Sequence, residues 1–404
     1  MIVLIADKFE QTGIDALRAA GMRVRVEPGL EDAALAAGVA ESGCEVLVVR
    51  STKVTGPVLA ASPLLSLVVR AGAGYNTIDV GAASARSIPV ANCPGKNSIA
   101  VAELTFALIL ALDRRVVDNA VDLRRGVWNK KEYSKAGGLK GRTLGIVGMG
   151  DIGHAVAARA RAFEMRVVAW SRSLTDEAAA ACDVERCGSV AEVADQSDIL
   201  TVHLAATAET KHVINADVLN RLKPGSFVIN TARAEVVDYR ALADAMKSRQ
   251  LRVGLDVYPD EPSAGTGTFA DAIVKCEGVV YGTHHIGAST EQAQDAIAAE
   301  TVRIIVTFAK TGRVLNCVNV RQPGADGWTL RVRHENKPGV LAHVLRELSL
   351  DGINVEEMEN VIMAGETGAC AHIRLDAKPR ADTIERIRSG SGSILAVSCT
   401  SASA

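Results

Sequence analysis

The stretch TLGIVGMGDIG (Thr143–Gly153) decides the fold predicted for this chain. Its first half is a run of aliphatic and β-branched residues, which predicts a short buried strand. The residues that follow, as far as Phe163, have the apolar spacing of a helix. Three glycines in a GxGxxG pattern join the two elements, in the strand–turn–helix context that this motif requires. The stretch therefore predicts a parallel α/β sheet with a dinucleotide-binding turn.

Each glycine of the motif has a separate physical task. Gly148 allows the tight turn, Gly150 lets the backbone approach a pyrophosphate, and Gly153 lets the helix pack closely on the strand. Asp151 and Ile152 open the helix, where unpaired N–H groups and the positive end of the helix dipole favour bound phosphates. We therefore expect these five residues to contact the cofactor.

The end of the next predicted strand, Arg166–Trp170, favours NADP over NAD. An Asp or Glu here would bind the adenosine ribose and repel a 2′-phosphate, but this chain has Ser171 and Arg172. A hydroxyl followed by a guanidinium can bind a 2′-phosphate. The alternative is a solvated loop in an NAD enzyme whose ribose hydroxyls are held by other groups.

Strand-like and helical segments alternate from the first residue to about residue 285. Short runs rich in Val, Ile and Leu are separated by amphipathic stretches such as Gln11–Ala20, and a long helical stretch runs from Ser98 to Arg114. This alternation is typical of parallel sheets with helices on both faces. The pattern stops near residue 320, where RQPGADG is typical of a linker, and the remaining residues predict a separate βαββαβ domain.

The bulk composition argues against several classes of protein. The chain has 404 residues, 48% of them hydrophobic and 23% charged, with a net charge of −2, so a basic surface for nucleic acid is not expected. Its apolar runs are too short for a signal peptide or a membrane span. Eight cysteines occur singly, without the spacing of a zinc site. We expect a cytosolic protein with reduced thiols, no metal, and no nucleic-acid or membrane partner.

Seven motifs in one order resemble the D-isomer-specific 2-hydroxyacid dehydrogenases, and within them the phosphoglycerate dehydrogenase branch of serine biosynthesis. That branch oxidises 3-phospho-D-glycerate. Reduction of glyoxylate or hydroxypyruvate by another type of enzyme in the family is an alternative, and a nicotinamide-sensing corepressor of the same fold is a third. The resemblance covers essentially the whole chain, in RSTKVT (50–55), RAGAGYN (70–76), KNSIAVAEL (96–104), VGMGDIG (147–153), NTARAEVVD (230–238), LDVYPDEP (255–262) and HHIGAST (284–290).

The resemblance implies a catalytic set of His285, Glu261 and Arg233. In this family the His exchanges a proton with the substrate hydroxyl, the Glu pairs with that His, and the Arg holds the substrate carboxylate beside the nicotinamide. The residue types suit the chemistry, because imidazole titrates in the useful range and a planar guanidinium binds a carboxylate bidentately. Cofactor contacts are also implied at Thr231, Ala232, Asp256 and His285.

The chain departs from the family pattern in two places. His284 stands where the family usually has Pro, so either imidazole of the pair is a candidate for the proton transfer, and the position favours His285. The glycine pair that usually follows the catalytic Arg is Ala234 and Glu235 here, which adds a carboxylate nearby. The second departure bears on the choice of substrate more than on the class of reaction.

Loops that follow strands of the first domain are implied to bind a small-molecule substrate. Arg50, Lys53 and Arg70 would supply the additional cations that a phosphorylated substrate needs. The alternative is that they are ordinary exposed basic residues at strand ends. The implied substrate set is Arg50, Ser51, Lys53, Arg70, Ala71, Gly72, Gly74 and, beside the nicotinamide, Asn97.

The segment HENKPGVLAHVLRELSLDGINVEEM (334–358) resembles an ACT domain, an amino-acid-binding module. The resemblance implies an effector site for L-serine at His334, Asn336 and Asn354. The alternative is a domain that only mediates dimerisation by pairing of sheets. A homodimer or a homotetramer is expected.

These patterns and the resemblance predict an α/β protein with three domains. A flavodoxin-like substrate domain (1–92 and 288–318) contains an inserted Rossmann NAD(P)-binding domain (93–287). A linker (319–327) and the ACT domain (328–404) follow.

Overall fold

The computed structural model describes residues 1–262, 266–321 and 327–401. It divides into two compact units, Met1–Asn319 and Val320–Ala404. Each unit has its own hydrophobic core, and the first unit contains two parallel sheets. The linker predicted at 319–327 falls for the most part outside the described residues.

The first sheet has five parallel strands in the order β2-β1-β3-β4-β5. Alternate residues of a strand point to opposite faces, and both faces are buried here because helices cover both. Leu4, Leu47 and Val68 pack against one set of helices, and Val46 and Leu67 against the other. The strands are β1 (Ile2–Ile5), β2 (Arg23–Val26), β3 (Val46–Val49), β4 (Leu67–Arg70) and β5 (Val90–Ala91).

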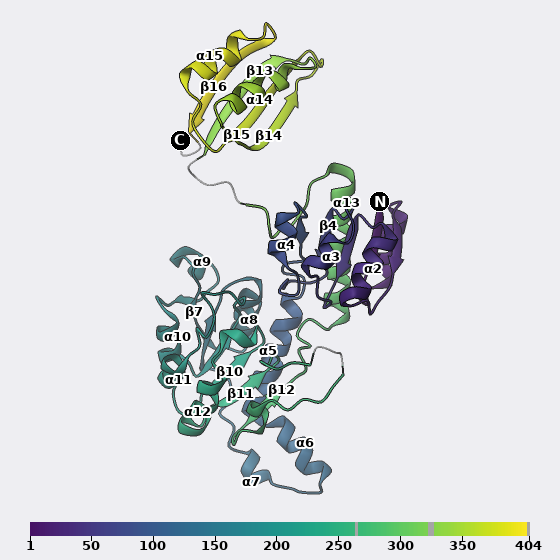
Figure 1. Cartoon of the computed structure of the whole chain (residues 1–404). Coiled ribbons are helices and arrows are strands. Elements are labelled where there is room, and N and C mark those ends of the chain that lie inside the picture. Colours follow the sequence, from purple (N-terminus) through teal and green to yellow (C-terminus); the bar gives the residue numbers. More distant parts are fainter. Residues whose placement is uncertain (263–265, 322–326, 402–404) are drawn as a thin grey trace. The chain divides into compact units, whose positions relative to one another are not determined.

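The two helical layers of this sheet come from distant parts of the sequence. One layer joins α1 (Gln11–Ala19) to α13 (Glu291–Thr311), which returns to the sheet late in the chain. The other layer consists of α2 (Asp32–Ser42), α3 (Gly56–Ala60) and α4 (Val80–Ala85), and the elements are labelled in Figure 1. The return of α13 fits the proposal that residues 288–318 belong with residues 1–92.

The second sheet has seven parallel strands in the order β12-β11-β10-β9-β6-β7-β8. Counted from β6, this is the doubly wound order of a dinucleotide-binding fold with one further strand, and the first sheet has the flavodoxin-like order. The predicted fold class is therefore confirmed. The strands are β6 (Thr143–Val147), β7 (Arg166–Trp170), β8 (Glu185–Arg186), β9 (Ile199–Val202), β10 (Phe227–Asn230), β11 (Arg252–Leu255) and β12 (Val280–Gly282).

Helices cover both faces of the second sheet. One core cluster joins α5 and α8 to its strands, and a second joins α10, α11 and α12 to them. The long helix predicted from Ser98 to Arg114 is present with those bounds as α5. The helices are α5 (Ser98–Arg114), α6 (Val116–Arg124), α7 (Lys130–Tyr133), α8 (Asp151–Ala162), α9 (Asp176–Ala181), α10 (Val190–Gln196), α11 (Ala216–Arg221), α12 (Tyr239–Arg249) and two short 3₁₀ turns, Ala234–Val236 and Ala272–Lys275.

The second unit is a four-stranded antiparallel sheet with two helices on one face. Its strand order is β14-β15-β13-β16, and its element order confirms the predicted βαββαβ pattern. Alternate residues of β13 and β15 are buried under the helices. The elements are β13 (Trp328–Glu335), α14 (Val340–Leu350), β14 (Val355–Ile362), β15 (Gly368–Leu375), α15 (Ala381–Ser389) and β16 (Ile394–Ser401).

No helix in the described ranges is long and apolar enough to cross a membrane.

Candidate active site

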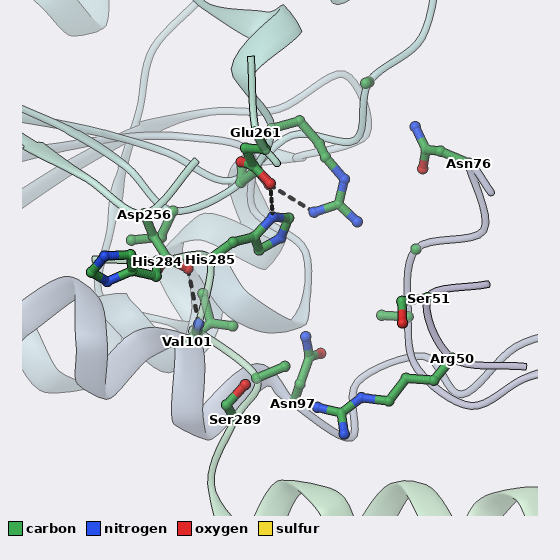
Figure 2. Close-up of a pocket in the computed structure, with 18 of the residues that line it drawn as sticks. Arg50, Ser51, Asn76, Asn97, Val101, Asp256, Glu261, His284, His285 and Ser289 are labelled. Carbon is green, nitrogen blue, oxygen red and sulfur yellow. Dashed lines mark hydrogen bonds and ion pairs between the residues drawn. The ribbon is translucent and has the colours of Figure 1, made fainter. Parts of the chain in front are cut away.

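A cleft of about 1390 Å³ lies in the first unit, lined by loops from both parallel sheets. The lining segments follow β1, β3 and β4 of the first sheet, and β9, β10, β11 and β12 of the second. Ligands of open parallel sheets bind outside the carboxyl ends of the strands, and these loops stand at those ends. Figure 2 shows side chains from both sheets facing one another across this cleft.

The turn after β6 has the geometry that a dinucleotide needs. Gly148 has φ +107°, and a Cβ there would lie 2.4 Å from the carbonyl oxygen of His203. A Cβ on Gly153 would lie 2.2 Å from the carbonyl oxygen of Gly148, so the start of α8 packs directly on the turn. Gly150 differs, because nothing lies within 4 Å of the position of its Cβ. The open space at Gly150, at the start of a twelve-residue helix, fits a pyrophosphate.

The next two residues of the motif have different surroundings. Ile152 lines the cleft. The Asp151 carboxylate lies against Gly95, where a Cβ would be 2.8 Å from Oδ2. A contact of Asp151 with the cofactor stays a prediction, and the carboxylate is exposed at the helix start.

Ser171 and Arg172 follow β7 as predicted, with Ser171 half-buried and Arg172 exposed. Within the described ranges Arg172 makes no ion pair. A hydrogen bond from Thr207 and one from a backbone N–H lower the pKa of the Glu209 carboxyl, and the positive charge of Arg172 lowers it further. A carboxylate therefore stands close enough to this guanidinium to interact with it.

His285 and Glu261 form a pair in the cleft wall. His285 Nδ1 lies 2.7 Å from Glu261 Oε2, and the backbone N–H of Tyr258 donates to Glu261 Oε1 at 2.8 Å. Burial alone would raise the pKa of Glu261, but the hydrogen bonds from His285 and Tyr258 and the charge of Arg233 outweigh it and lower the pKa. An ionised Glu261 requires the Nδ1 proton of His285, so Nε2 is the ring nitrogen left for a ligand.

The loop that carries the two histidines is held by Asp256, whose side chain is only 1% exposed. Asp256 Oδ1 accepts from Thr283 Oγ1 at 2.6 Å and from Ile286 N at 2.8 Å, and Oδ2 accepts from Gly287 N at 2.9 Å. Both oxygens are thus used to position this loop, and a contact with the cofactor stays a prediction.

The two adjacent histidines of this loop are placed differently. His285 has φ +52°, a left-handed conformation that turns its ring toward Glu261. His284 is exposed and lies apart from the His285–Glu261 pair in Figure 2. Only His285 of the two contacts the carboxylate, and its role in proton transfer stays a prediction.

Three arginines from two sheets gather in the cleft. Arg233 donates from Nη1 to the carbonyl of Ala232 at 2.7 Å. Burial, together with the charges of Arg233 and Arg50, lowers the pKa of Arg70 to about 10. Arg50 and Arg70 make no ion pair in the part of the chain that the structure describes. Cations held close together without carboxylate partners favour an anionic ligand with more than one charged group.

The other residues of the predicted substrate set fall into two groups. Ser51, Ala71, Gly74 and Asn97 line the cleft, as do the cofactor candidates Thr231 and Ala232. Lys53 and Gly72 are not part of the cleft wall, since Lys53 is exposed outside it and Gly72 is buried. Glu235 is also exposed and outside the lining, so its carboxylate does not face the cleft.

Two residues at the cleft were not singled out from the sequence. The Asp7 carboxylate accepts the backbone N–H groups of Arg50, Ser51 and Thr52 at 2.6, 3.2 and 3.1 Å, and so shapes the loop after β3. His203 lines the cleft behind the glycine turn, where burial lowers the pKa of its imidazole to about 3. A polar residue directly after a buried strand was the available signal for both.

The candidate effector residues lie in the second unit. His334 is buried, with Nδ1 near the carbonyl of Glu335 at 2.8 Å and Nε2 near Asn360 Oδ1 at 3.1 Å. Both ring nitrogens therefore have partners inside the fold. Asn336 donates to the carbonyl of Glu366 at 2.9 Å, and Asn354 is exposed. Binding of an amino acid by these residues stays a prediction.

Comparison with protein families gives one match. Residues 106–287 match the model described as D-isomer specific 2-hydroxyacid dehydrogenase, NAD binding domain. This range contains the glycine turn, the arginine after β10 and the His285–Glu261 pair.

Several curated relatives are similar over most of this chain. The D-3-phosphoglycerate dehydrogenase of Methanocaldococcus jannaschii is 35% identical over 79% of this chain and 60% of its own length. The D-3-phosphoglycerate dehydrogenase of Escherichia coli is 32% identical over 87% of this chain and 86% of its own. The glyoxylate reductase of Thermococcus litoralis is 36% identical over 66% of this chain and 81% of its own. The chain thus spans about 60% of the length of the first of these relatives.

Solved structures resemble this chain over about four fifths of its length. NAD⁺-bound 3-phosphoglycerate dehydrogenase of Entamoeba histolytica has a TM-score of 0.67 and 25% identity, covering 79% of this chain and 98% of its own. An NADPH-dependent glyoxylate/hydroxypyruvate reductase of Sinorhizobium meliloti has a TM-score of 0.69 and 26% identity, covering 78% of this chain and 97% of its own.

Glu261→Gln should change how stability responds to acid. The folded state lowers the pKa of Glu261, so its contribution is present at neutral pH and is lost as the pH falls through the folded pKa. At pH 7 the free energy of unfolding of the variant should be lower by about 1 kcal/mol, which is the contribution of one charge-assisted hydrogen bond reduced for partial exposure to solvent. The difference between variant and wild type should become smaller at acidic pH. Urea unfolding at several pH values measures it, with the exposed Glu277→Gln as control. A difference that grows toward low pH would contradict the assignment.

Proposed function

The chain belongs to the D-isomer specific 2-hydroxyacid dehydrogenase family, and on that premise we propose that it oxidises the D-2-hydroxy acid 3-phospho-D-glycerate to 3-phosphohydroxypyruvate. The observation that carries the proposed reaction is the His285–Glu261 pair, whose free ring nitrogen remains for a hydroxyl in the cleft. The reaction would be the dehydrogenation that opens serine biosynthesis in the relatives this chain resembles.

The residues of the chain would divide the work of the reaction. His285 Nε2 accepts the proton of the substrate hydroxyl, and Glu261 holds the opposite ring nitrogen and stabilises the resulting imidazolium. Arg233 binds the substrate carboxylate, which orients C2. A nicotinamide bound beside C2 would supply the hydride acceptor, so that the loss of the hydroxyl proton and of a hydride leaves a carbonyl at C2. The reverse reaction uses the same residues in the opposite order.

The arginines favour a substrate with a second anionic group. Arg233 is sufficient for one carboxylate, whereas Arg50 and Arg70 add two cations from the first sheet at the same cleft. A phosphate at the far end of a three-carbon acid would use these charges. Lys53, which was expected to contribute, is not needed for this arrangement.

Reduction of glyoxylate or hydroxypyruvate is the second candidate. Two observations favour it: the likeness to a glyoxylate reductase over 81% of that protein's length, and the exposed Arg172, which suits NADPH. The same proton transfer and the same carboxylate contact would serve this reaction. A corepressor function is less favoured, because a sensor has no need of the His285–Glu261 pair.

Purified protein should oxidise 3-phospho-D-glycerate in preference to D-lactate and glycolate, measured as the rate of NADH or NADPH formation. His285→Ala should lower kcat by roughly a hundredfold or more, the scale of a lost general acid/base, and the neighbouring His284→Ala is the matched control with little effect. Faster turnover of glyoxylate or hydroxypyruvate would select the second candidate. A dead His284→Ala with an active His285→Ala would refute the catalytic assignment.

We favour NADP as the cofactor because Arg172 is exposed after β7 and no carboxylate follows that strand directly. Arg172→Ala should weaken NADPH binding by about tenfold, the order of one lost charge-assisted contact, and leave NADH binding nearly unchanged. Fluorescence titration of both dinucleotides measures this, with the exposed Arg161→Ala on α8 as control. An equal loss of affinity for NADPH and NADH, or no loss for either, would favour NAD as the cofactor instead.

We also propose a homodimer or homotetramer, and exposed apolar residues on and beside α6 support it. None of the residues of α6 is buried. Exposed apolar patches of this kind on a folded protein are commonly buried against a partner chain. The residues are Val116, Val117, Val121, Leu123, Val127 and Trp128, of which Trp128 is 80% exposed.

The second unit is proposed to bind L-serine as an inhibitor through Asn336 and Asn354, since the ring of His334 already has two partners. A ligand bound outside the cleft affects turnover only if it favours one arrangement of the protein over another. L-Serine should therefore lower turnover of the full chain, and Asn354→Ala should remove this inhibition while leaving the uninhibited rate nearly intact. Calorimetry that detects no binding at millimolar L-serine would leave this unit with an assembly function only.

A further inference from the structure

A buried asparagine forms a hydrogen bond to the loop after β4, and this asparagine has no part in the function proposed above. This loop, residues 70–74, is called the arginine-seat loop below. Asn92 is 8% exposed, and its Nδ2 donates to the carbonyl of Ala73 at 2.6 Å. The next residue adds a backbone contact, because Cys93 N donates to the carbonyl of Gly72 at 2.9 Å. The side chain of Asn92 is thus the polar anchor of the loop at its centre.

Two guanidinium groups lie against the glycines of the arginine-seat loop. A Cβ on Gly74 would lie 2.0 Å from Arg233 Nη2, and a Cβ on Gly72 would lie within contact distance of the Arg70 guanidinium. Gly72 also has φ +150°, which side chains rarely adopt. Arg233 comes from the second sheet, so the loop is the surface of the first sheet on which it rests. The position of the loop therefore affects the space available to both guanidinium groups.

Asn92 is held in turn by a second asparagine from the end of the first unit. Asn92 N donates to the carbonyl of Asn316 at 3.3 Å, and Asn316 Nδ2 donates to the carbonyl of Asn92 at 3.3 Å. Asn316 Nδ2 also donates to Glu300 Oε1 at 2.7 Å, and Glu300 is only 6% exposed. Glu300 accepts an ion pair from Lys96 at 3.6 Å. The buried carboxylate therefore fixes Asn316, which fixes the backbone of Asn92.

The chain that carries Asn316 leads directly to the second unit, which begins at Val320. It runs along the edge of β5, where Cys317 bridges Ala91. Asn319 closes this segment, with Oδ1 accepting from Val90 N at 2.8 Å and Nδ2 donating to the carbonyl of Ile88 at 3.0 Å. Asn319 thus holds the same segment as Asn316 but does not reach the arginine-seat loop.

We propose that Asn92 is a positioning residue for substrate binding, and that Asn316 is the support through which the last segment of the first unit maintains it. Asn92 would fix the position of the arginine-seat loop at the cleft. It would thereby fix the positions at which Arg70 and Arg233 meet the anionic groups of the substrate. The inference rests on the proposed function, since it assigns these arginines to a 2-hydroxy or 2-oxo acid. It predicts an effect on the acid and none on the dinucleotide.

The test measures acid and dinucleotide binding separately, in the full chain. The probe is oxalate, an unreactive dicarboxylate of the size of a 2-oxo acid, titrated by calorimetry, with NADH titrated by fluorescence. Asn92→Ala should raise the Kd of oxalate and the KM of the turned-over acid by about tenfold, equivalent to about 1.4 kcal/mol. The NADH Kd should stay within about twofold, because the glycine turn that would bind the dinucleotide is not touched. Asn92→Asp, which keeps the shape but not the donor, should do at least as much.

Two further variants separate positioning from general damage. Asn316→Ala should raise the oxalate Kd by a smaller factor, whereas Asn319→Ala, the matched control, should leave it unchanged. Unchanged oxalate binding in Asn92→Ala and Asn92→Asp, with wild-type melting temperatures, would overturn the inference and leave the proposed function standing. Equal losses of oxalate, NADH and kcat would overturn it too, by indicating general damage. Wild-type protein that neither binds oxalate nor turns over any acid would overturn the proposed function itself.

Discussion

Parallel strands of one sheet must end at the same edge, and the site depends on this constraint. The first sheet ends in the loops that carry Arg50 and Arg70, and the second ends in those that carry Arg233, Asp256 and His285. Antiparallel strands would have divided these residues between two edges. Because α13 returns to the first sheet directly after the histidine loop, one chain can present both sets of loops to a single cleft.

The carboxylates of the cleft differ in the groups from which they accept hydrogen bonds. Asp7 and Asp256 spend their oxygens on backbone N–H groups, so they shape the two loops that present cations and imidazole to the ligand. Glu261 instead accepts from an imidazole, and its lowered pKa keeps it charged for that contact. Each of these carboxylates thus has hydrogen-bond partners within the protein, whereas Arg50 and Arg70 make no ion pair among the described residues and can pair with an anion.

Local patterns predicted the elements well and the contacts between them poorly. The bounds of β6, β7 and α5 agree with the sequence because the two strands are short apolar runs and the helix is one long stretch rich in apolar residues, so that their limits are visible in the residues themselves. The strands of the first sheet are shorter than their apolar runs, since residues beyond the paired core still lie buried at loop entries. The anchor of Asn92 on Ala73 and its tie to Asn316, 224 residues away, depend on chain return, which no local spacing contains. The left-handed φ of His285 is likewise set by Asp256 and Glu261 rather than by its own residue type.

The two departures from the family pattern have unequal consequences, because contacts between distant segments fix the loops of the site. Replacing the usual Pro by His284 adds an imidazole at an exposed position, but the direction of His285 is maintained by contacts on its other side, from Asp256 to Ile286 and Gly287. The loop therefore does not need the rigidity of a proline to present the catalytic ring. Replacing two glycines by Ala234 and Glu235 is tolerated because they form a short 3₁₀ turn that directs Glu235 to solvent. A Cβ at Gly74 would lie 2.0 Å from Arg233 Nη2 of the other sheet, so bulk there would displace this guanidinium. A glycine of the first sheet's loop thus bears on the position of this arginine, whereas Ala234 and Glu235, which replace the usual glycines, are not part of the cleft wall.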